Sequence, residues 1–347
     1  MYTTDMNILE NEDLAKHSTM CLGGQARYMV EVQSRADVEE AVAWAVDHRM
    51  PPLMIGDGSN IVWRDEGFEG LLLINKIAGY EDFAEDEINR YLTVGAGENW
   101  DNVVAQTTAS GLTGIEALSL IPGTVGATPI QNVGAYGQQI SDVLVSVEAY
   151  DLHTRQFVTL PGSDCAFGYR TSRFKTTDRD RYFICHLTMH LMFQNPEPPF
   201  YRTLAEYLSE HNITICSPQV IRDAVIDIRT HKLPDPAKVA NNGSFFANPI
   251  IDNDLLVELQ AEYPSLPKWP EANGMFKIPA AWLIEQAGYK DFEDPETGMS
   301  TWPNQPLVLV NDHAQSTAQL LKFKQKIVDA VETKFHITLV QEPELLP

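Results

Sequence analysis

The most informative part of the chain is a glycine-rich stretch at residues 120–137, which reads LIPGTVGATPIQNVGAYG. It contains no charged side chain, so its backbone could lie directly against a flat ring or a pyrophosphate. A flexible loop would have a similar composition. However, apolar residues such as Ile121, Val125 and Ile130 are interleaved with the glycines, which favours an ordered, packed segment. We therefore interpret the stretch as one wall of a ligand site.

A second glycine turn, GDGSN at residues 56–60, follows a short apolar run at residues 53–55. Glycine adopts positive φ easily, and such a turn can bring successive backbone N–H groups together around an anion such as phosphate. A tight turn between two strands would explain the same residues equally well. The chain contains neither a G-x-G-x-x-G motif nor a P-loop, so neither of these nucleotide sites has direct support.

A basic cluster lies within FGYRTSRFK at residues 167–175 and consists of Arg170, Arg173 and Lys175. It stands out in a chain with 25 Lys and Arg against 48 Asp and Glu. A guanidinium binds a carboxylate or phosphate through two parallel hydrogen bonds, so the cluster predicts an anion clamp. The alternative is a surface turn whose charges balance nearby carboxylates such as Asp178.

Two further residues could take part in chemistry. Ser244 lies on a glycine turn in NNGSFFANP, residues 241–249, which is not the G-x-S-x-G elbow of a hydrolase nucleophile. Its hydroxyl could deliver a proton, or it could simply be a turn residue. Glu342, in the EPE motif after the last apolar run, reads by itself as an ordinary exposed carboxylate. These patterns alone indicate an anion-binding, nucleotide-binding α/β enzyme.

The composition restricts the class of protein. A length of 347 residues predicts two or more domains, and the formal net charge of −23 argues against nucleic acid or an anionic membrane as the main partner. No apolar run approaches the roughly 18 residues of a membrane span, and the N-terminus lacks a signal-peptide pattern. Four widely spaced cysteines without a C-x-x-C pair predict free thiols, no metal site and a reducing cytoplasm.

Hydrophobic periodicity and turn residues predict a mixture of helices and strands. Helices are expected at residues 35–49, around 103–107, from 218 to about 230, at 280–286 and at 316–333. Strands are expected at residues 53–55, 71–75, 91–94, 143–150, 182–193, 307–310 and 336–340. The KLPDP segment at residues 232–236 ends the third helix, and it is the best candidate for a domain boundary.

Eight motifs, taken in order, resemble the UDP-N-acetylenolpyruvoylglucosamine reductase (MurB) family, flavoenzymes of bacterial peptidoglycan precursor synthesis. The resemblance runs from about His17 to Glu344, which is nearly the whole chain. The motifs are IGDGSN (55–60), VGAGENW (94–100), IPGTVG (121–126), PIQNVGAYG (129–137), FGYR (167–170), KLPDP (232–236), GSFF (243–246) and EPE (342–344). An insertion near residues 196–207 is similar to the longer, type I branch, in which a tyrosine loop closes over the nucleotide.

The resemblance implies an α+β fold class: a PCMH-type (VAO-like) FAD-binding fold of two subdomains plus a C-terminal α/β substrate-binding domain. FAD-binding subdomain 1 is expected at residues 1–75. Subdomain 2, which includes the tyrosine loop, is expected at residues 76–233. The substrate-binding domain would then span residues 234–335, and a terminal strand and tail carrying Glu342 would span residues 336–347.

The resemblance also implies ligands. FAD is expected as cofactor, NADPH as co-substrate and UDP-N-acetylglucosamine enolpyruvate as substrate, with no nucleic acid, membrane, metal or obligate protein partner. The FAD pyrophosphate would lie against Gly56, Asp57, Gly58, Ser59 and Asn60. The isoalloxazine ring would lie against Gly123, Thr124, Gly126, Ala127, Asn132, Gly134, Ala135 and Tyr136.

The family's chemistry moves a hydride from flavin N5 to C3 of the enolpyruvyl group and a proton to C2. The resemblance implies that Arg170 pairs with the substrate carboxylate, that Glu342 acts on the same carboxylate, and that Ser244 protonates C2. Four residues match positions used around the UDP-sugar: Tyr201, Lys232, Asn248 and Gln305. Two alternatives remain open at this point, a FAD-linked oxidase of the same superfold and a non-catalytic module that binds flavin or UDP-sugar.

Overall fold

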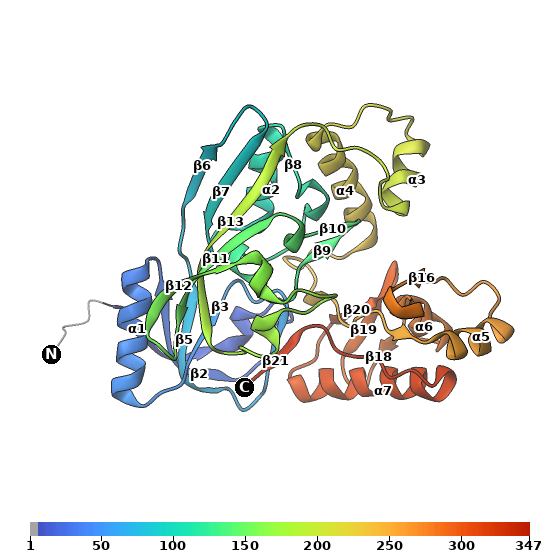
Figure 1. The fold of residues 1–347 in the computed structure, drawn as a ribbon. Coiled ribbons are helices and arrows are strands. Elements are labelled where there is room, and N and C mark those ends of the chain that lie inside the picture. Colours follow the sequence, from blue (N-terminus) through green and yellow to red (C-terminus); the bar gives the residue numbers. More distant parts are fainter. Residues whose placement is uncertain (1–5) are drawn as a thin grey trace. The chain divides into compact units, whose positions relative to one another are not determined.

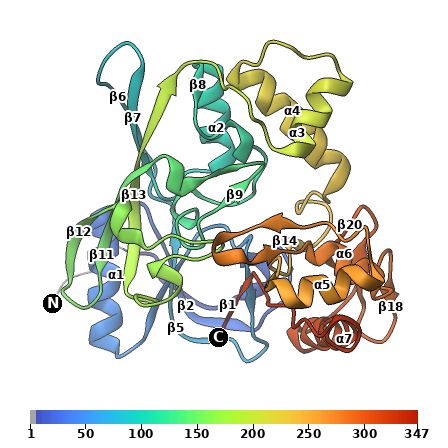
Figure 2. The ribbon, with the colours of Figure 1, turned by 45° about the vertical axis from the view of Figure 1, so that its right-hand side comes forward.

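The computed structural model describes residues 6–347, and these residues form two compact units. The first unit contains the chain up to Glu12, Ala26–Asp57 and Phe68–His231. The second contains Asp13–Gln25, Gly58–Gly67 and Lys232–Pro347. Figures 1 and 2 show the elements of both units and label most of them. Two short N-terminal segments therefore belong to the same unit as the C-terminal third of the chain.

One sheet of the first unit is covered by a single helix. Its strands, in spatial order, are β1 (Leu9–Asp13), β2 (Gln25–Val32), β5 (Phe68–Asn75) and β3 (Pro52–Ile55), and both β2 and β3 run parallel to β5. Helix α1 (Arg35–His48) begins where Ser34 accepts the N–H of Asp37 at 3.2 Å, which confirms the predicted helix. Figure 1 shows α1 on this sheet, and its buried residues Val38, Ala41, Val42 and Ala45 pack with Val30, Val32, Leu71 and Leu73.

The larger sheet of the first unit is antiparallel. Its strands, in order, are β12 (Gln156–Pro161), β11 (Leu144–Asp151), β13 (Tyr182–Phe193), β7 (Asn89–Gly95) and β6 (Tyr80–Ala84), and β8 (Leu112–Thr113) pairs with the end of β13. Helix α2 (Trp100–Ala109) shares a core with this sheet through Trp100, Val103 and Val104. The predicted strand at residues 182–193 is confirmed as β13.

The glycine-rich stretch is packed within the first unit. It contains a single 3₁₀ turn at Val125–Ala127 and one strand of a small hairpin, in which β9 (Gly134–Ala135) pairs with β10 (Gln138–Gln139). Several of its residues are buried, namely Thr124, Val125, Thr128 and Asn132. The interpretation as an ordered segment is therefore confirmed, and the flexible-loop alternative is wrong.

Two helices of the first unit share a small core of their own. Helices α3 (Arg202–Glu210) and α4 (Pro218–Lys232) lie side by side in Figures 1 and 2. The core consists of Ala117, Leu204, Leu208, Ile221, Ala224 and Val225. Ser217 accepts the N–H of Val220 at 3.3 Å, so α4 begins at the predicted serine and proline.

The second unit contains two sheets, a two-stranded pair and three helices. The larger sheet has the order β14 (Asn241–Ser244), β20 (Gln305–Asn311), β19 (Met299–Trp302) and β18 (Glu293–Asp294), and the smaller has the order β15 (Ile250–Ile251), β17 (Phe276–Lys277) and β16 (Trp269–Pro270). The helices are α5 (Asn253–Glu262), α6 (Ala280–Gln286) and α7 (Thr317–Phe335). Met20, Leu22 and Val62 from the two N-terminal segments are buried in the same core as Phe245, Phe246 and Phe323.

The predicted strand at residues 336–340 is wrong. Ile337 and Leu339 are buried at alternate positions, which imitates a strand in the sequence, but the segment forms no ladder with a neighbouring strand. The C-terminal strand is instead β21 (Glu344–Leu346), which runs parallel to β4 (Ile61–Trp63). None of the helices in residues 6–347 combines the length and the apolar character that a membrane crossing requires.

Candidate active site

The glycine-rich stretch is held by the segment that precedes α2. The N–H of Val125 donates to the carbonyl of Glu98, and the N–H of Gly126 donates to the carbonyl of Ala96, both at 2.9 Å. A Cβ on Gly126 would lie only 2.6 Å from the Cβ of Ala96. This close approach of two backbones requires glycine, and it leaves a surface made mainly of backbone atoms.

The first half of the GDGSN turn meets the same stretch. A Cβ on Gly56 would lie 2.2 Å from Oγ1 of Thr124, so glycine is required here as well. Thr124 is buried, and its hydroxyl has no hydrogen-bond partner among residues 6–347. A buried hydroxyl normally has a partner, so this atom points to a bound group. Lys76, 3.3 Å from Asp57, adds a positive charge beside the turn.

The second half of the turn, residues 58–60, lies in the second unit and is held by Asn242. The side-chain amide of Asn242 donates to the carbonyl groups of Ser59 (3.3 Å) and Ile61 (3.2 Å). Its Oδ1 atom is buried and has no partner in the described part of the chain. No motif in the sequence marks Asn242 as a site residue, and its one signal is its position two residues before Ser244.

Arg170 is anchored to the glycine-rich stretch. Its Nη2 donates to the carbonyl of Gly134 at 2.8 Å, and the side-chain amide of Asn132 donates to the carbonyl of Gly168 at 3.2 Å. Arg170 and Asn132 both have left-handed backbone conformations, with φ of +53° and +51°. The structure therefore brings together Arg170, Asn132 and Gly134, three of the predicted site residues.

The predicted clamp of three basic residues is wrong in part. Arg173 forms an ion pair with Asp178 at 2.6 Å and also donates to the carbonyl of Asp164 at 3.0 Å. Lys175 donates to the side chain of Gln131 at 3.3 Å. For Arg173 the alternative prediction is therefore correct, since its guanidinium is already paired with the carboxylate of Asp178, five residues further along the chain.

Backbone pairing connects the segment of Glu342 with the turn that follows Ser244. The N–H of Glu342 donates to the carbonyl of Phe245, and the N–H of Ala247 donates to the carbonyl of Val340, both at 2.9 Å. Glu342 is only 8 % exposed, so the expectation of an ordinary exposed carboxylate is wrong. Ser244 is the last residue of strand β14, and not a turn residue as the sequence predicts. Within the second unit, a buried acid and this hydroxyl thus occupy neighbouring segments.

The four residues predicted around the UDP-sugar have different surroundings. Tyr201 immediately precedes α3, and its ring meets that of Tyr136 edge-on, with 6.1 Å between the ring centroids. Asn248 accepts a backbone N–H at the start of α6 at 2.9 Å. Lys232 ends α4 and Gln305 opens β20. Tyr201 therefore lies beside the glycine-rich stretch, whereas the roles of Lys232, Asn248 and Gln305 stay predictions.

Three charged residues near the stretch were missed in the sequence. Asp101 on α2 and Arg222 on α4 form an ion pair at 2.6 Å. Arg229 donates to the carbonyl of Leu120 at 3.3 Å and hydrogen-bonds Tyr136. Burial lowers the pKa of the Arg229 guanidinium, against the opposing influence of Tyr136 and Asp101. Single charges on amphipathic helices look like surface residues in a sequence, so no motif marked them.

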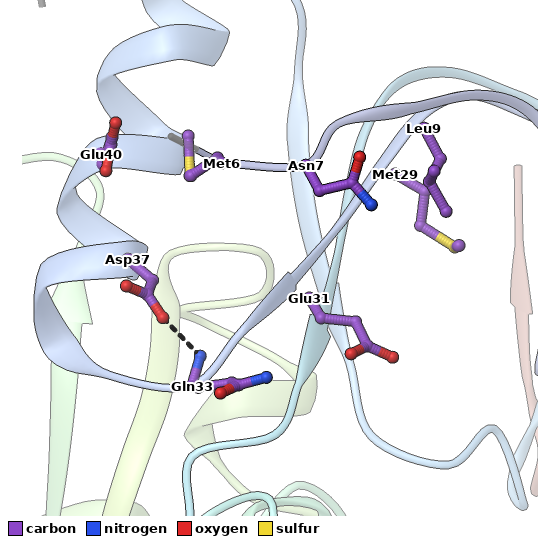
Figure 3. A pocket seen from close by; sticks show the side chains of 8 residues that line it. All are labelled: Met6, Asn7, Leu9, Met29, Glu31, Gln33, Asp37 and Glu40. Carbon is purple, nitrogen blue, oxygen red and sulfur yellow. Dashed lines mark hydrogen bonds between the residues drawn. The ribbon is translucent and has the colours of Figure 1, made fainter. Parts of the chain in front are cut away.

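A hollow of about 560 Å³ lies elsewhere in the first unit, at β2 and α1 (Figure 3). It is lined by Met6, Asn7, Leu9, Met29, Glu31, Gln33, Asp37 and Glu40. Its three carboxylates are accompanied by no cation among the lining residues, and Asp37 already accepts the N–H of Gln33 at 2.7 Å. A pyrophosphate does not suit this surface, so the glycine turns remain the better cofactor site.

The residues around the turns fit a flavin dinucleotide. The ring of such a cofactor needs a flat, uncharged wall, and its pyrophosphate needs backbone N–H groups with little steric obstruction. The glycine-rich stretch, with the unpartnered hydroxyl of Thr124, provides the wall, and the turn at Gly56 provides the cradle.

Comparison with known proteins identifies the family. A protein-family model described as an FAD binding domain matches residues 26–157, and one described as the C-terminal domain of UDP-N-acetylenolpyruvoylglucosamine reductase matches residues 235–346. The UDP-N-acetylenolpyruvoylglucosamine reductase of Ralstonia nicotianae is 40% identical over 336 residues, which cover 96% of this chain and 97% of the relative. The UDP-N-acetylenolpyruvoylglucosamine reductase of Amoebophilus asiaticus is 40% identical over 343 residues, which cover 98% of this chain and 99% of that relative. This chain belongs to the UDP-N-acetylenolpyruvoylglucosamine reductase family.

A solved structure with the same family name has the same fold. The reductase (MurB) from Thermus caldophilus aligns with a TM-score of 0.68 and 21% identity, and the alignment covers 99% of this chain and 100% of that one. The predicted family and the predicted FAD-binding fold with a C-terminal domain are therefore confirmed. The subdomain boundaries at residues 75 and 335 stay predictions.

Proposed function

We propose that this member of the UDP-N-acetylenolpyruvoylglucosamine reductase family reduces UDP-N-acetylglucosamine enolpyruvate to UDP-N-acetylmuramate, with NADPH as the electron donor. The name of its relatives and the FAD binding domain support a flavin-dependent oxidoreductase of peptidoglycan synthesis. The observation that carries the assignment is the pairing of the buried Glu342 segment with the turn after Ser244. An oxidase that passes its electrons to oxygen has no use for an acid and a proton donor arranged in this way.

The bound cofactor supplies the redox chemistry. FAD, when bound, would accept a hydride from NADPH and deliver it from N5 to C3 of the enolpyruvyl group. The nucleotide NADPH and the UDP-sugar would use this flavin in turn, which explains why the chain needs no separate Rossmann motif. We further propose that the reaction takes place in the cytoplasm, which is consistent with four cysteines that are all free thiols.

Arg170 is proposed to bind the substrate carboxylate. Hydride addition at C3 leaves negative charge at C2, and this charge is shared with the adjacent carboxylate as an enolate forms. A guanidinium stabilises that charge through a two-pronged hydrogen bond. The hydrogen bond from Arg170 to Gly134 supports this role, because it fixes the guanidinium beside the glycine-rich stretch.

Ser244 and Glu342 are proposed to complete the reaction. The Ser244 hydroxyl would give its proton to C2, which is basic enough at this point to take a proton from an unactivated alcohol. Glu342 would act on the substrate carboxylate, and it can do so favourably only while it shares or donates a proton, because two bare carboxylates in contact repel. We propose that Tyr201, Lys232, Asn248 and Gln305 bind the UDP-sugar.

Anaerobic spectroscopy of the purified protein tests this function. The FAD-loaded protein is expected to be yellow, NADPH should bleach it, and UDP-N-acetylglucosamine enolpyruvate should restore the colour with formation of UDP-N-acetylmuramate. Recovery of the colour with oxygen but not with the enolpyruvyl nucleotide would instead identify an oxidase. Protein that cannot be loaded with FAD would contradict both readings.

A further inference from the structure

The first residues of α2 hold the beginning of the glycine-rich stretch at three points. The indole N–H of Trp100 donates to the carbonyl of Leu118, and the backbone N–H of Trp100 donates to the carbonyl of Gly123, both at 3.0 Å. Between these two points, Oδ1 of Asp101 accepts the N–H of Leu120 at 2.5 Å. The turn that leads into residues 121–127 is therefore attached to α2.

Leu120 is the unusual residue of this turn. Its φ is +58°, in the left-handed region that branched side chains rarely adopt. Its side chain is 39 % exposed, so packing of the side chain does not account for this conformation. Hydrogen bonds of its backbone explain the conformation instead. The N–H of Leu120 donates to Asp101, and its carbonyl accepts a hydrogen bond from Nη2 of Arg229 at 3.3 Å. The conformation of Leu120 thus depends on two charged side chains.

Asp101 is itself fixed by α4. Nη1 and Nη2 of Arg222 donate to its two oxygens at 2.6 and 2.9 Å, and Arg222 is only 8 % exposed. Burial would raise the pKa of the Asp101 carboxyl, but the hydrogen bonds from Arg222 and from the N–H of Leu120 outweigh it and hold the pKa below its ordinary value. Asp101 is therefore a charged hydrogen-bond acceptor at neutral pH, and the bidentate hydrogen bonds from Arg222 fix the orientation of its carboxylate.

We propose that Asp101 is a positioning residue for bound FAD, because it fixes Leu120 in its left-handed conformation and thereby sets the face that residues 121–127 present to the isoalloxazine ring. The inference rests on the proposed function in one respect, that the bound group is FAD. The inference distinguishes the isoalloxazine ring of the cofactor from its pyrophosphate. Asp101 acts on the wall that faces the ring, and not on the turn at Gly56 that is predicted to hold the pyrophosphate.

A simpler role would be that the ion pair between Asp101 and Arg222 only joins α2 to α4. Two double variants separate these roles, because both of them lack the ion pair. In Asp101→Asn/Arg222→Leu, the amide oxygen can still accept the N–H of Leu120. In Asp101→Ala/Arg222→Leu, this acceptor is gone, so the two proteins differ mainly in the hydrogen bond to Leu120.

The experiment measures FAD affinity by fluorescence titration, ADP affinity by competition and the visible absorption of the bound flavin. Loss of the hydrogen bond to Leu120 should weaken FAD binding by about tenfold in the alanine double variant, while the asparagine double variant stays within about threefold of the wild type. The fine structure of the visible flavin band should change in the alanine protein only. ADP, which lacks the ring, should bind both variants as it binds the wild type.

Equal FAD affinity and equal flavin spectra in the two double variants would overturn this inference, and so would a parallel loss of FAD and ADP binding. Should the alanine double variant fail to fold, Asp101→Glu provides the second test, because one added methylene displaces the carboxylate from Leu120 while the charge is kept. Weaker FAD binding with unchanged ADP binding is expected there too, and unchanged FAD binding would contradict the role. Wild-type protein that binds FAD but does not reduce the enolpyruvyl nucleotide would contradict the proposed function alone.

Discussion

The glycine-rich stretch and the Ser244 segment (residues 241–249) are held in place by different means. Backbone hydrogen bonds to residues 96–100 fix the stretch, and its glycines permit contacts that a Cβ would prevent. The Ser244 segment depends on the side chain of Asn242 and on backbone pairing with the segment of Glu342. In the proposed function the first region binds the cofactor, whereas the second supplies the reactive side chains. We expect changes in the first to alter cofactor affinity and changes in the second to alter a rate.

Ser244→Ala should have the largest effect and should confine it to one half-reaction. General acid catalysis contributes about 10²- to 10⁴-fold, so reoxidation of the flavin by the enolpyruvyl nucleotide should slow by that factor, while reduction by NADPH changes little. Anaerobic stopped-flow absorbance measures both steps. Ser300→Ala removes a buried hydroxyl from the same unit and should leave both rates unchanged. Equal slowing of both steps by Ser244→Ala would rule out a proton-donor role.

Arg170→Lys should have the next largest effect, because an ammonium cannot reproduce the two-pronged hydrogen bond of a guanidinium. We expect reoxidation to slow by about 10- to 100-fold at low substrate concentration. Arg173→Lys is the matched control, since Arg173 is paired with Asp178 and should tolerate the change within about twofold. Steady-state kcat/KM for the enolpyruvyl nucleotide separates the two variants. If they behaved alike, the assignment of Arg170 to the substrate carboxylate would be lost.

Gly126→Ala tests the first region. The new Cβ would lie 2.6 Å from the Cβ of Ala96, so the stretch must shift, and we expect FAD to bind about tenfold more weakly. The rate of reoxidation in FAD-saturated protein should change much less. Ala96→Gly/Gly126→Ala removes one of the two clashing carbons and should recover part of the affinity. A normal FAD affinity in the single variant would mean that this close approach is not needed for binding.

Asp151→Asn should affect neither region, and it therefore serves as a control for stability alone. Asp151 accepts two hydrogen bonds from Arg181, at 3.0 and 2.8 Å, and these bonds lower its pKa to about 2. A pKa lowered by folding stabilises the protein above the unfolded-state pKa, and this stabilisation is lost as the pH falls towards 2. We expect the variant to lose about 1–2 kcal/mol at pH 7, with a difference from the wild type that shrinks below about pH 5. Urea unfolding at several pH values measures this difference, and a difference independent of pH would contradict it.

Local elements of the fold could be predicted from the sequence because their signals are local. Helix α1 is marked by Ser34 and a regular apolar face. Strand β13 is marked by a long, mostly apolar run in which His186, Thr188 and His190 alternate with apolar residues. The segment at residues 336–340 has the alternation of a strand, but a sequence does not say whether an extended segment finds a partner. Glu342 was misjudged for the same reason, since its burial depends on pairing with Phe245.

The candidate site could be predicted as far as its motifs extend. The motifs identified Arg170, Asn132 and Gly134. In the structure Arg170 donates to the carbonyl of Gly134, and Asn132 donates to the carbonyl of Gly168, two residues before Arg170. They did not identify Asp101 and Arg222, which are 121 residues apart and meet only in the folded chain. Their contribution is a hydrogen bond to the backbone of Leu120, and neither residue belongs to a glycine motif. Contacts of this kind can be found only from coordinates.

The pairing of β4 with β21 has a consequence for how the protein is made. Ile61 is synthesised roughly 15–60 s before its partner Glu344 at ordinary translation rates. During this interval the short strand β4 has an open edge, and the core around Met20 and Val62 lacks its C-terminal aromatic residues. The second unit therefore assembles late, and a nascent chain stalled before residue 344 should be a client for chaperones.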